Sequence, residues 1–151
     1  LIRHLKKVEK ILNKNGAYHL IIPDKRYCFD ALLPCSKISE IIEAYYEKRK
    51  VHPFSKVFEH RSCTVHNDAE KHWNNDHGEI QFNMNSLDEP RTEFLNSNGS
   101  YIDVHSWQFT PESFYEIITA LNSMGFINLK TDLVCGTPKN RLEFTVKLSF
   151  T

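Results

Sequence analysis

The apolar positions of this chain follow two different periods, which divide it into helical and extended segments. Between Leu1 and Asn13 the apolar residues recur every three or four positions, with Lys and Arg between them, which predicts an amphipathic helix. Gly16 suits the left-handed position just past the end of that helix. Residues 17–22 then form a short apolar run that stops at Pro23. Such a run predicts a strand that is covered on both faces, in the middle of a largely parallel sheet.

The last third of the chain shows first a helical and then an extended pattern of apolar residues. Thr110, Pro111 and the acidic residue after them predict a helix start, and Gly125 ends the helix. Residues 126–134 are typical of a strand. Residues 142–150 alternate strictly between apolar and polar side chains, and a six-residue connector precedes that alternation. The two strands are therefore expected to form an antiparallel hairpin.

The segment between these regions is less regular. A second helix is expected within residues 30–49, with Ser36 or Ser39 as its cap. Residues 52–99 are polar and weakly periodic, with helix favoured over 57–70 and a short strand or helix start over 79–82. Long irregular segments inside a domain usually carry function. We therefore expect residues 31–100 to be an insertion that covers a crevice at the carboxyl end of the strand formed by residues 18–22.

Composition narrows the class of protein. The chain has 151 residues, enough for one domain, and its 19 Lys and Arg balance 19 Asp and Glu. A net charge of zero gives no indication of binding to nucleic acid or to an anionic membrane. No apolar run is long enough to span a bilayer. The four scattered cysteines are too few for a disulfide framework, which favours a cytoplasmic location. Because the chain opens in mid-helix at Leu1, we expect it to be part of a longer one.

Several stretches resemble the class I S-adenosylmethionine-dependent methyltransferases. The helix, Gly16 and the strand that ends in Pro23 are similar to the stretch that contains that family's fifth strand. Residues 105–114 (HSWQFTPESF) and 121–126 are similar to the segment that leads into the family's last helix and closing antiparallel hairpin. The strings 22–30 (IPDKRYCFD) and 101–105 (YIDVH) resemble a bacterial subgroup often found among cell-surface polysaccharide genes.

The resemblance implies an α/β fold: the C-terminal part of a Rossmann-like methyltransferase sheet that lacks the N-terminal cofactor-binding strands. Residues 1–151 would then be a single partial domain, inactive alone. No two of the five glycines are close enough for the family's Gly-rich loop, so no cofactor-binding residue is assigned, and the S-adenosylmethionine site is expected mostly outside this chain. The methyl acceptor would be an oxygen or nitrogen of a sugar or other small polar molecule.

The residues just after the first predicted strand are the candidate acceptor-binding residues: Asp24, Lys25, Arg26 and Tyr27. Arg and Lys can hold a carboxylate or phosphate there, and Arg can do so with two parallel hydrogen bonds. The alternative is a solvated loop with one internal ion pair.

Two histidines and a tryptophan complete the candidate site. His105 stands before the Thr110 helix and is a candidate general base, because its ordinary pKa lies near working pH. His60, in the insertion, is the second candidate base. Trp107 would line the donor pocket or stack on a sugar ring, unless it belongs to the core.

The insertion is also rich in potential metal ligands. His60, Cys63, His66, His72 and His77 fall within 18 residues, and imidazole and thiolate are good zinc ligands. No second pair recurs at a zinc-module spacing, so we assign no metal site and keep a small zinc-stabilised domain as a weak alternative.

The main alternative to an enzyme fragment is a non-catalytic binding module derived from the same fold. Its truncated sheet would expose an edge and an apolar face, which a homo-oligomer could cover.

Overall fold

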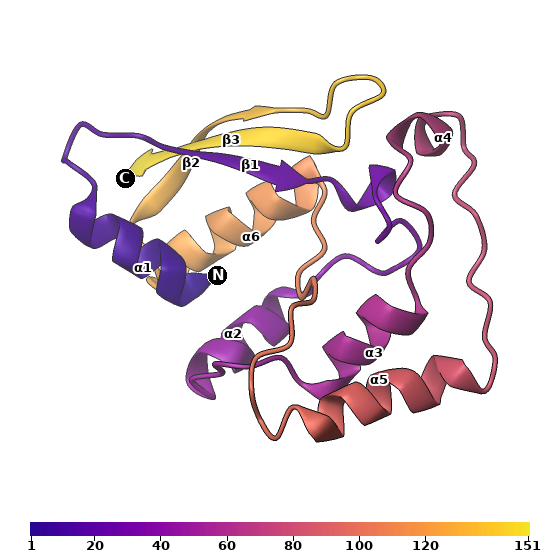
Figure 1. Ribbon diagram of the computed structural model, residues 1–151. Helices are drawn as coiled ribbons and strands as arrows, with labels where there is room; N and C mark the ends of the chain where they lie inside the picture. Colours follow the sequence, from indigo (N-terminus) through magenta and orange to yellow (C-terminus); the bar gives the residue numbers. More distant parts are fainter.

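A three-stranded antiparallel sheet lies over two helices and forms one half of the molecule (Figure 1). The computed structural model describes residues 1–151, with strands β1 (Tyr18–Pro23), β2 (Leu129–Cys135) and β3 (Glu143–Phe150). The strand order is β1-β3-β2, so the last strand of the chain occupies the centre. Because β3 is antiparallel to both neighbours, β1 and β2 run in the same direction.

The flanking helices follow the sequence pattern closely. Helix α1 (Ile2–Ile11) buries Ile2, Leu5 and Val8, as its apolar period predicts. Helix α6 (Pro111–Ser123) has Thr110 as its N-cap, whose side chain accepts a hydrogen bond from the Ser113 backbone in a reciprocal capping box. The predicted first helix, last helix and closing hairpin are therefore confirmed, as is the mixed α/β composition.

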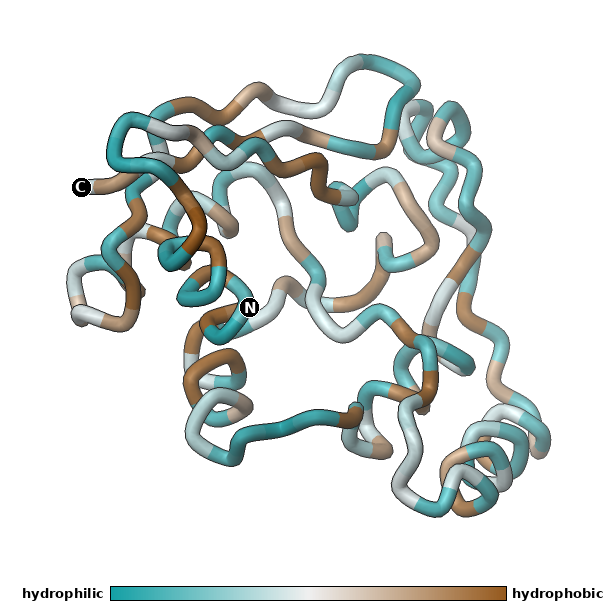
Figure 2. The backbone as a smooth tube through the Cα atoms, turned by 60° about the vertical axis from the view of Figure 1, so that its left-hand side comes forward, coloured by the Kyte–Doolittle hydropathy of each residue, from teal (hydrophilic) through white to brown (hydrophobic).

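One apolar core joins the sheet to α1 and α6. It contains 14 buried residues, and its strand side comes largely from Phe144, Val146 and Leu148 on β3. Figure 2 shows the hydrophobic segments gathered where the sheet meets these helices, while the stretch after α2 is hydrophilic. The sheet thus buries one face only.

The insertion forms four helices in the other half of the molecule. After η1 (Lys25–Tyr27) come α2 (Ile38–Tyr46), α3 (Phe54–Ser62), α4 (Ala69–Trp73) and α5 (Asn85–Asn96). Helices α3 and α5 share a small separate core of Val57, Ile102 and Val104, against which Phe94 packs.

The structure corrects several local predictions. Strand β1 is not covered on both faces: its burial alternates, and the Ile21 side chain is 74% exposed. β1 is an edge strand, paired only with β3. Gly16 is not left-handed, because α1 ends earlier with an extended Leu12 as its C-cap. A Cβ on Gly16 would meet Leu12 Cδ1 at 3.0 Å, so close packing explains this glycine.

The insertion departs furthest from expectation. Helix α2 has Lys37 as its N-cap, whereas the buried Ser36 hydroxyl accepts a hydrogen bond from the Gln108 backbone. The helix favoured over 57–70 is divided between α3 and α4, and residues 79–82 form neither helix nor strand. Helix α5 was not anticipated, because Pro90 lies inside it and its apolar period is weak.

The longest helix, α6, has 13 residues, and none of the helices combines the length and apolar character needed to cross a bilayer.

A matched pair of threonine substitutions tests the one-sided sheet. Val146→Thr should lower the free energy of unfolding by about 1–3 kcal/mol, because it buries a hydroxyl without a partner. Ile21→Thr should change it by no more than about 0.5 kcal/mol, because that side chain is exposed. Urea unfolding measures both, and an equal loss in the two variants would mean that the outer face of β1 is covered.

Candidate functional site

The carboxyl end of β1 is fixed by a buried carboxylate. Asp24 has no exposed surface, and its two oxygens accept four hydrogen bonds. Three come from the backbone and guanidinium of Arg26, at 2.7–3.1 Å, and the fourth comes from the Thr137 hydroxyl at 2.7 Å. Because every lone pair faces a protein donor, the Asp24 side chain holds Arg26 in place and has no free position for a ligand.

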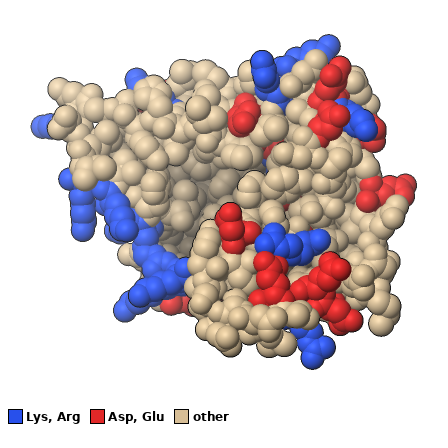
Figure 3. Space-filling view, viewed as in Figure 1, with Lys and Arg blue, Asp and Glu red and all other residues tan.

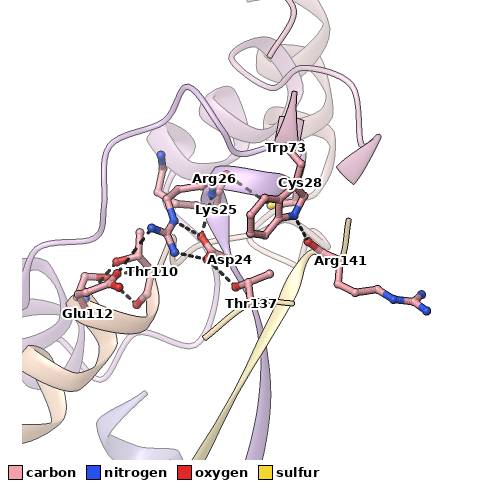
Figure 4. Close-up of polar contacts among 10 residues, drawn as sticks. Asp24, Lys25, Arg26, Cys28, Trp73, Thr110, Glu112, Thr137 and Arg141 are labelled. Atoms are coloured by element: carbon pink, nitrogen blue, oxygen red, sulfur yellow. Dashed lines mark hydrogen bonds and ion pairs between the residues drawn. The ribbon is translucent and has the colours of Figure 1, made fainter. Parts of the chain in front are cut away.

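The Arg26 guanidinium lies between two carboxylates. It binds Asp24 with two hydrogen bonds, and its Nη1 lies 3.9 Å from a carboxylate oxygen of Glu112 at the start of α6 (Figure 4). The hydrogen bond to Asp24 raises the pKa of Arg26 further above its ordinary value. With 42% of its side chain exposed, Arg26 keeps donors that face solvent.

Lys25 and Tyr27 point to different partners. The Lys25 ammonium donates to the Ala31 carbonyl at 2.8 Å, which closes the loop after η1. The Tyr27 ring stacks on Trp73 of α4, with ring centroids 4.1 Å apart and an interplanar angle of 3°. Trp73 in turn donates its indole N–H to the Arg141 carbonyl of the β2–β3 connector. A pocket of about 260 Å³ opens beside this stack, lined by Arg26, Tyr27, Trp73 and His77 among others.

His105 forms a dyad with an acidic residue that the sequence analysis did not single out. Its Nδ1 lies 3.0 Å from Oδ2 of Asp30, whose side chain is almost completely buried. The hydrogen bond from His105 to Asp30 raises the pKa of His105 above its ordinary value of 6.5. Since Nδ1 donates to the carboxylate, Nε2 carries the lone pair that can accept a proton. The second oxygen of Asp30, Oδ1, is buried without a hydrogen-bond partner.

His60 lies beside His105 but is arranged for a different role. Its Nδ1 accepts a hydrogen bond from the His105 backbone N–H at 3.2 Å, which places any proton of the neutral ring on Nε2. Burial lowers the pKa of His60, and the positive charge of Arg61 lowers it further. The Phe29 ring contacts both imidazoles, with centroids 4.5 Å from His105 and 5.3 Å from His60. His60 is thus a neutral hydrogen-bond donor at neutral pH, and His105 is the better base.

Trp107 belongs partly to the core. It packs against the main apolar core and also lines a pocket of about 120 Å³ between α1, α2 and the chain that precedes α6. Its neighbour Ser106 lies 2.7 Å from Nδ1 of His52 across that pocket.

The histidines after His60 stack rather than converge. The rings of His66 and His72 lie 4.3 Å apart, and Nδ1 of the buried His72 lies 2.9 Å from Nδ1 of His77. No group of three or more His, Cys, Asp or Glu side chains could hold a metal ion. All four cysteines are free, and burial raises the pKa of Cys28 to about 11, so this thiol stays protonated at neutral pH.

Apart from Trp107, the predicted residues lie on or beside one loop, residues 24–31. One end of the loop carries Arg26 and Tyr27, and the other carries Asp30, which holds His105. A parallel bridge from Asp24 to Phe109 joins the start of this loop to the segment that precedes α6. The sequence analysis did not identify Asp30 and Trp73 as site residues. The position of Asp30 directly after Cys28 and Phe29 could have indicated a buried carboxylate with a hydrogen-bond partner.

Comparison of the chain with protein-family models, with curated proteins and with solved structures gives no match.

The dyad predicts a pH dependence of stability. Because folding raises the pKa of His105, its contribution to stability is complete below about pH 6.5 and is lost as the pH rises through the raised value. Asp30→Asn should remove that loss, so the difference in free energy of unfolding between wild type and variant should shrink from pH 6 to pH 9. Urea unfolding at several pH values gives this difference. In NMR titrations the pKa of His105 should fall in Asp30→Asn and stay nearly unchanged in the Asp88→Asn control; an unchanged value in Asp30→Asn would refute the dyad.

Proposed function

We propose that this chain is the C-terminal part of a class I S-adenosylmethionine-dependent methyltransferase, and that it supplies the acceptor side of the active site. The observation that carries the proposal is the strand arrangement. β1 and β2 run in the same direction with the last strand of the chain antiparallel between them, as expected for the closing portion of a mixed sheet. The outer edge of β1 has no partner strand, so further parallel strands have a place to pair.

The methyl donor would be held mostly by those further strands. This chain has no Gly-rich loop that could bind the donor, since no two glycines are near one another in sequence. The Asp24 carboxylate has no free lone pair for it, because Arg26 and Thr137 already donate to both oxygens. S-adenosylmethionine would supply the methyl group. The residues of this chain would bind and orient the acceptor, a small polar molecule or a saccharide with an oxygen or nitrogen nucleophile.

The His105–Asp30 dyad would supply the general base on the acceptor side. His105 Nε2 would take the proton of the acceptor hydroxyl or amine, while Asp30 holds the ring and stabilises the imidazolium that forms. Neutral His60 would donate a hydrogen bond to the acceptor, and Arg26 would orient an anionic or hydroxyl group from the other end of the loop. Alignment of acceptor and methyl group would supply most of the rate. The free cysteines fit a cytoplasmic location.

Binding of the donor separates this proposal from its main alternative. S-adenosylmethionine should bind to the chain extended at its N-terminus by its natural coding sequence, and should not bind to residues 1–151 alone. Isothermal titration calorimetry measures both. Failure of the extended, folded chain to bind the donor would contradict the proposal and favour a non-catalytic interaction module.

The open edge of β1 is the observation that favours such a module. An unpaired edge strand can pair with another chain, and a second copy is the simplest partner. Residues 1–151 would then elute as a homo-oligomer in size-exclusion chromatography with light scattering, whereas the extended methyltransferase would have this edge filled by its own strands.

A further inference from the structure

One groove of the molecule is lined almost entirely by cations. It lies between α1 and the end of α2 and has a volume of about 630 Å³. Six of its eight lining residues are Lys or Arg: Arg3, Lys6, Lys7, Lys10, Lys48 and Lys50. The four on α1 share one side of the helix, because they are spaced by three or four residues, opposite the buried Ile2, Leu5 and Val8.

These six cations are not neutralised within the protein. None of them forms a salt bridge, whereas their neighbour Arg49 is paired with Glu43 and Glu47. Figure 3 shows a row of Lys and Arg side chains along α1 and the end of α2, whereas over α3 and α5 acidic side chains lie mixed with basic ones. The zero net charge of the chain therefore hides a local excess of positive charge that attracts an anion.

Aromatic rings form the remaining wall of the groove. Tyr46 is 70% exposed, and Tyr45 is half-buried against Phe126 with ring centroids 5.8 Å apart. An exposed ring beside several cations offers a planar surface next to the anion-binding groups.

The dimensions of the groove favour a small ligand over a polymer. Arg3 and Lys10 are seven residues apart, which is about 10 Å along a helix. The volume lies within the range of small-molecule sites, about 300–1,000 Å³. A long polyanion that ran beyond α2 would meet the exposed carboxylates of Glu43 and Glu47. A compact, highly charged anion such as a diphosphate matches these dimensions.

The groove adjoins a second pocket. The pocket that contains Trp107 and Ser106 shares Arg3, Tyr45 and Lys50 with the groove. Ser106 directly follows His105 in the chain. A ligand anchored in the groove therefore lies beside a pocket whose wall is one residue away in the chain from His105.

We propose that the groove binds the diphosphate of the methyl acceptor, so that the acceptor is a diphosphate ester of a sugar. That the ligand is a methyl acceptor rests on the proposed function. Binding of a diphosphate by the groove does not depend on it. Both a nucleoside diphosphate and a lipid diphosphate carry the required group, with Tyr46 beside a base in the first case and beside a lipid chain in the second.

Calorimetric titration with inorganic pyrophosphate tests the groove in residues 1–151. Pyrophosphate should bind, and the affinity should fall as salt concentration rises. Lys7→Gln/Lys10→Gln should weaken binding at least tenfold, because two exposed, unpaired cations are removed. The matched control, Lys130→Gln/Lys139→Gln, removes the same charge from exposed positions on β2 and the β2–β3 connector and should change affinity less than twofold.

Further ligands identify the source of the diphosphate. Tighter binding of a nucleoside diphosphate than of pyrophosphate supports a nucleotide-linked sugar, and tighter binding of a short-chain prenyl diphosphate supports a lipid-linked one. Absence of pyrophosphate binding, equal weakening in both double variants, or tighter binding of a single-stranded oligonucleotide or of vesicles of anionic phospholipid would overturn the proposal. Because no methyl donor is present in these titrations, their result is independent of whether the extended chain binds S-adenosylmethionine.

Discussion

The buried carboxylate of Asp24 is the interaction on which the geometry of the site depends. It lies directly after β1, and the backbone N–H groups of Asp24 and Lys25 donate to the carbonyls of Leu142 and Phe109 from two other segments. Burial of a charge is costly unless it is paired and fully hydrogen-bonded, and Asp24 meets both conditions through Arg26 and Thr137. The loop after β1, the β2–β3 connector and the chain before α6 are thereby held in one register. The position of His105 follows from that register, since it lies only four residues before Phe109.

The two ends of the loop hold their polar side chains in different ways. At one end, Arg26 is fixed by Asp24 and keeps a solvent-facing side. At the other end, Asp30 orients His105, and His60 is kept neutral by burial. These roles come from environment more than from residue type, because two histidines whose rings lie 5.7 Å apart have pKa values shifted in opposite directions.

The sequence predicted the elements whose signals are local. The α1 period, the Thr110 cap and the alternation along β3 each depend on near neighbours in the chain, and the structure confirms all three. The burial of β1 depends on which strands lie beside it, so an apolar run alone could not reveal that Ile21 is exposed. The candidate site likewise has a part that local sequence indicates and a part that only the fold shows. His105 was identifiable from its residue type, but its partner Asp30 is 75 positions away, and only tertiary structure brings the two together.

The small core shared by α3 and α5 has a consequence for how this molecule moves. Only three side chains are buried there, against 14 in the core beneath the sheet, and an ion pair between Arg61 and Glu93 spans the two helices. Separation of this subdomain exposes little apolar surface, so it costs far less free energy than global unfolding. His60 is carried by α3, whereas Asp30 and the Asp24 anchor belong to the sheet side. Local opening would therefore break the hydrogen bond from the His105 backbone to His60 and carry the His60 ring away from Asp30.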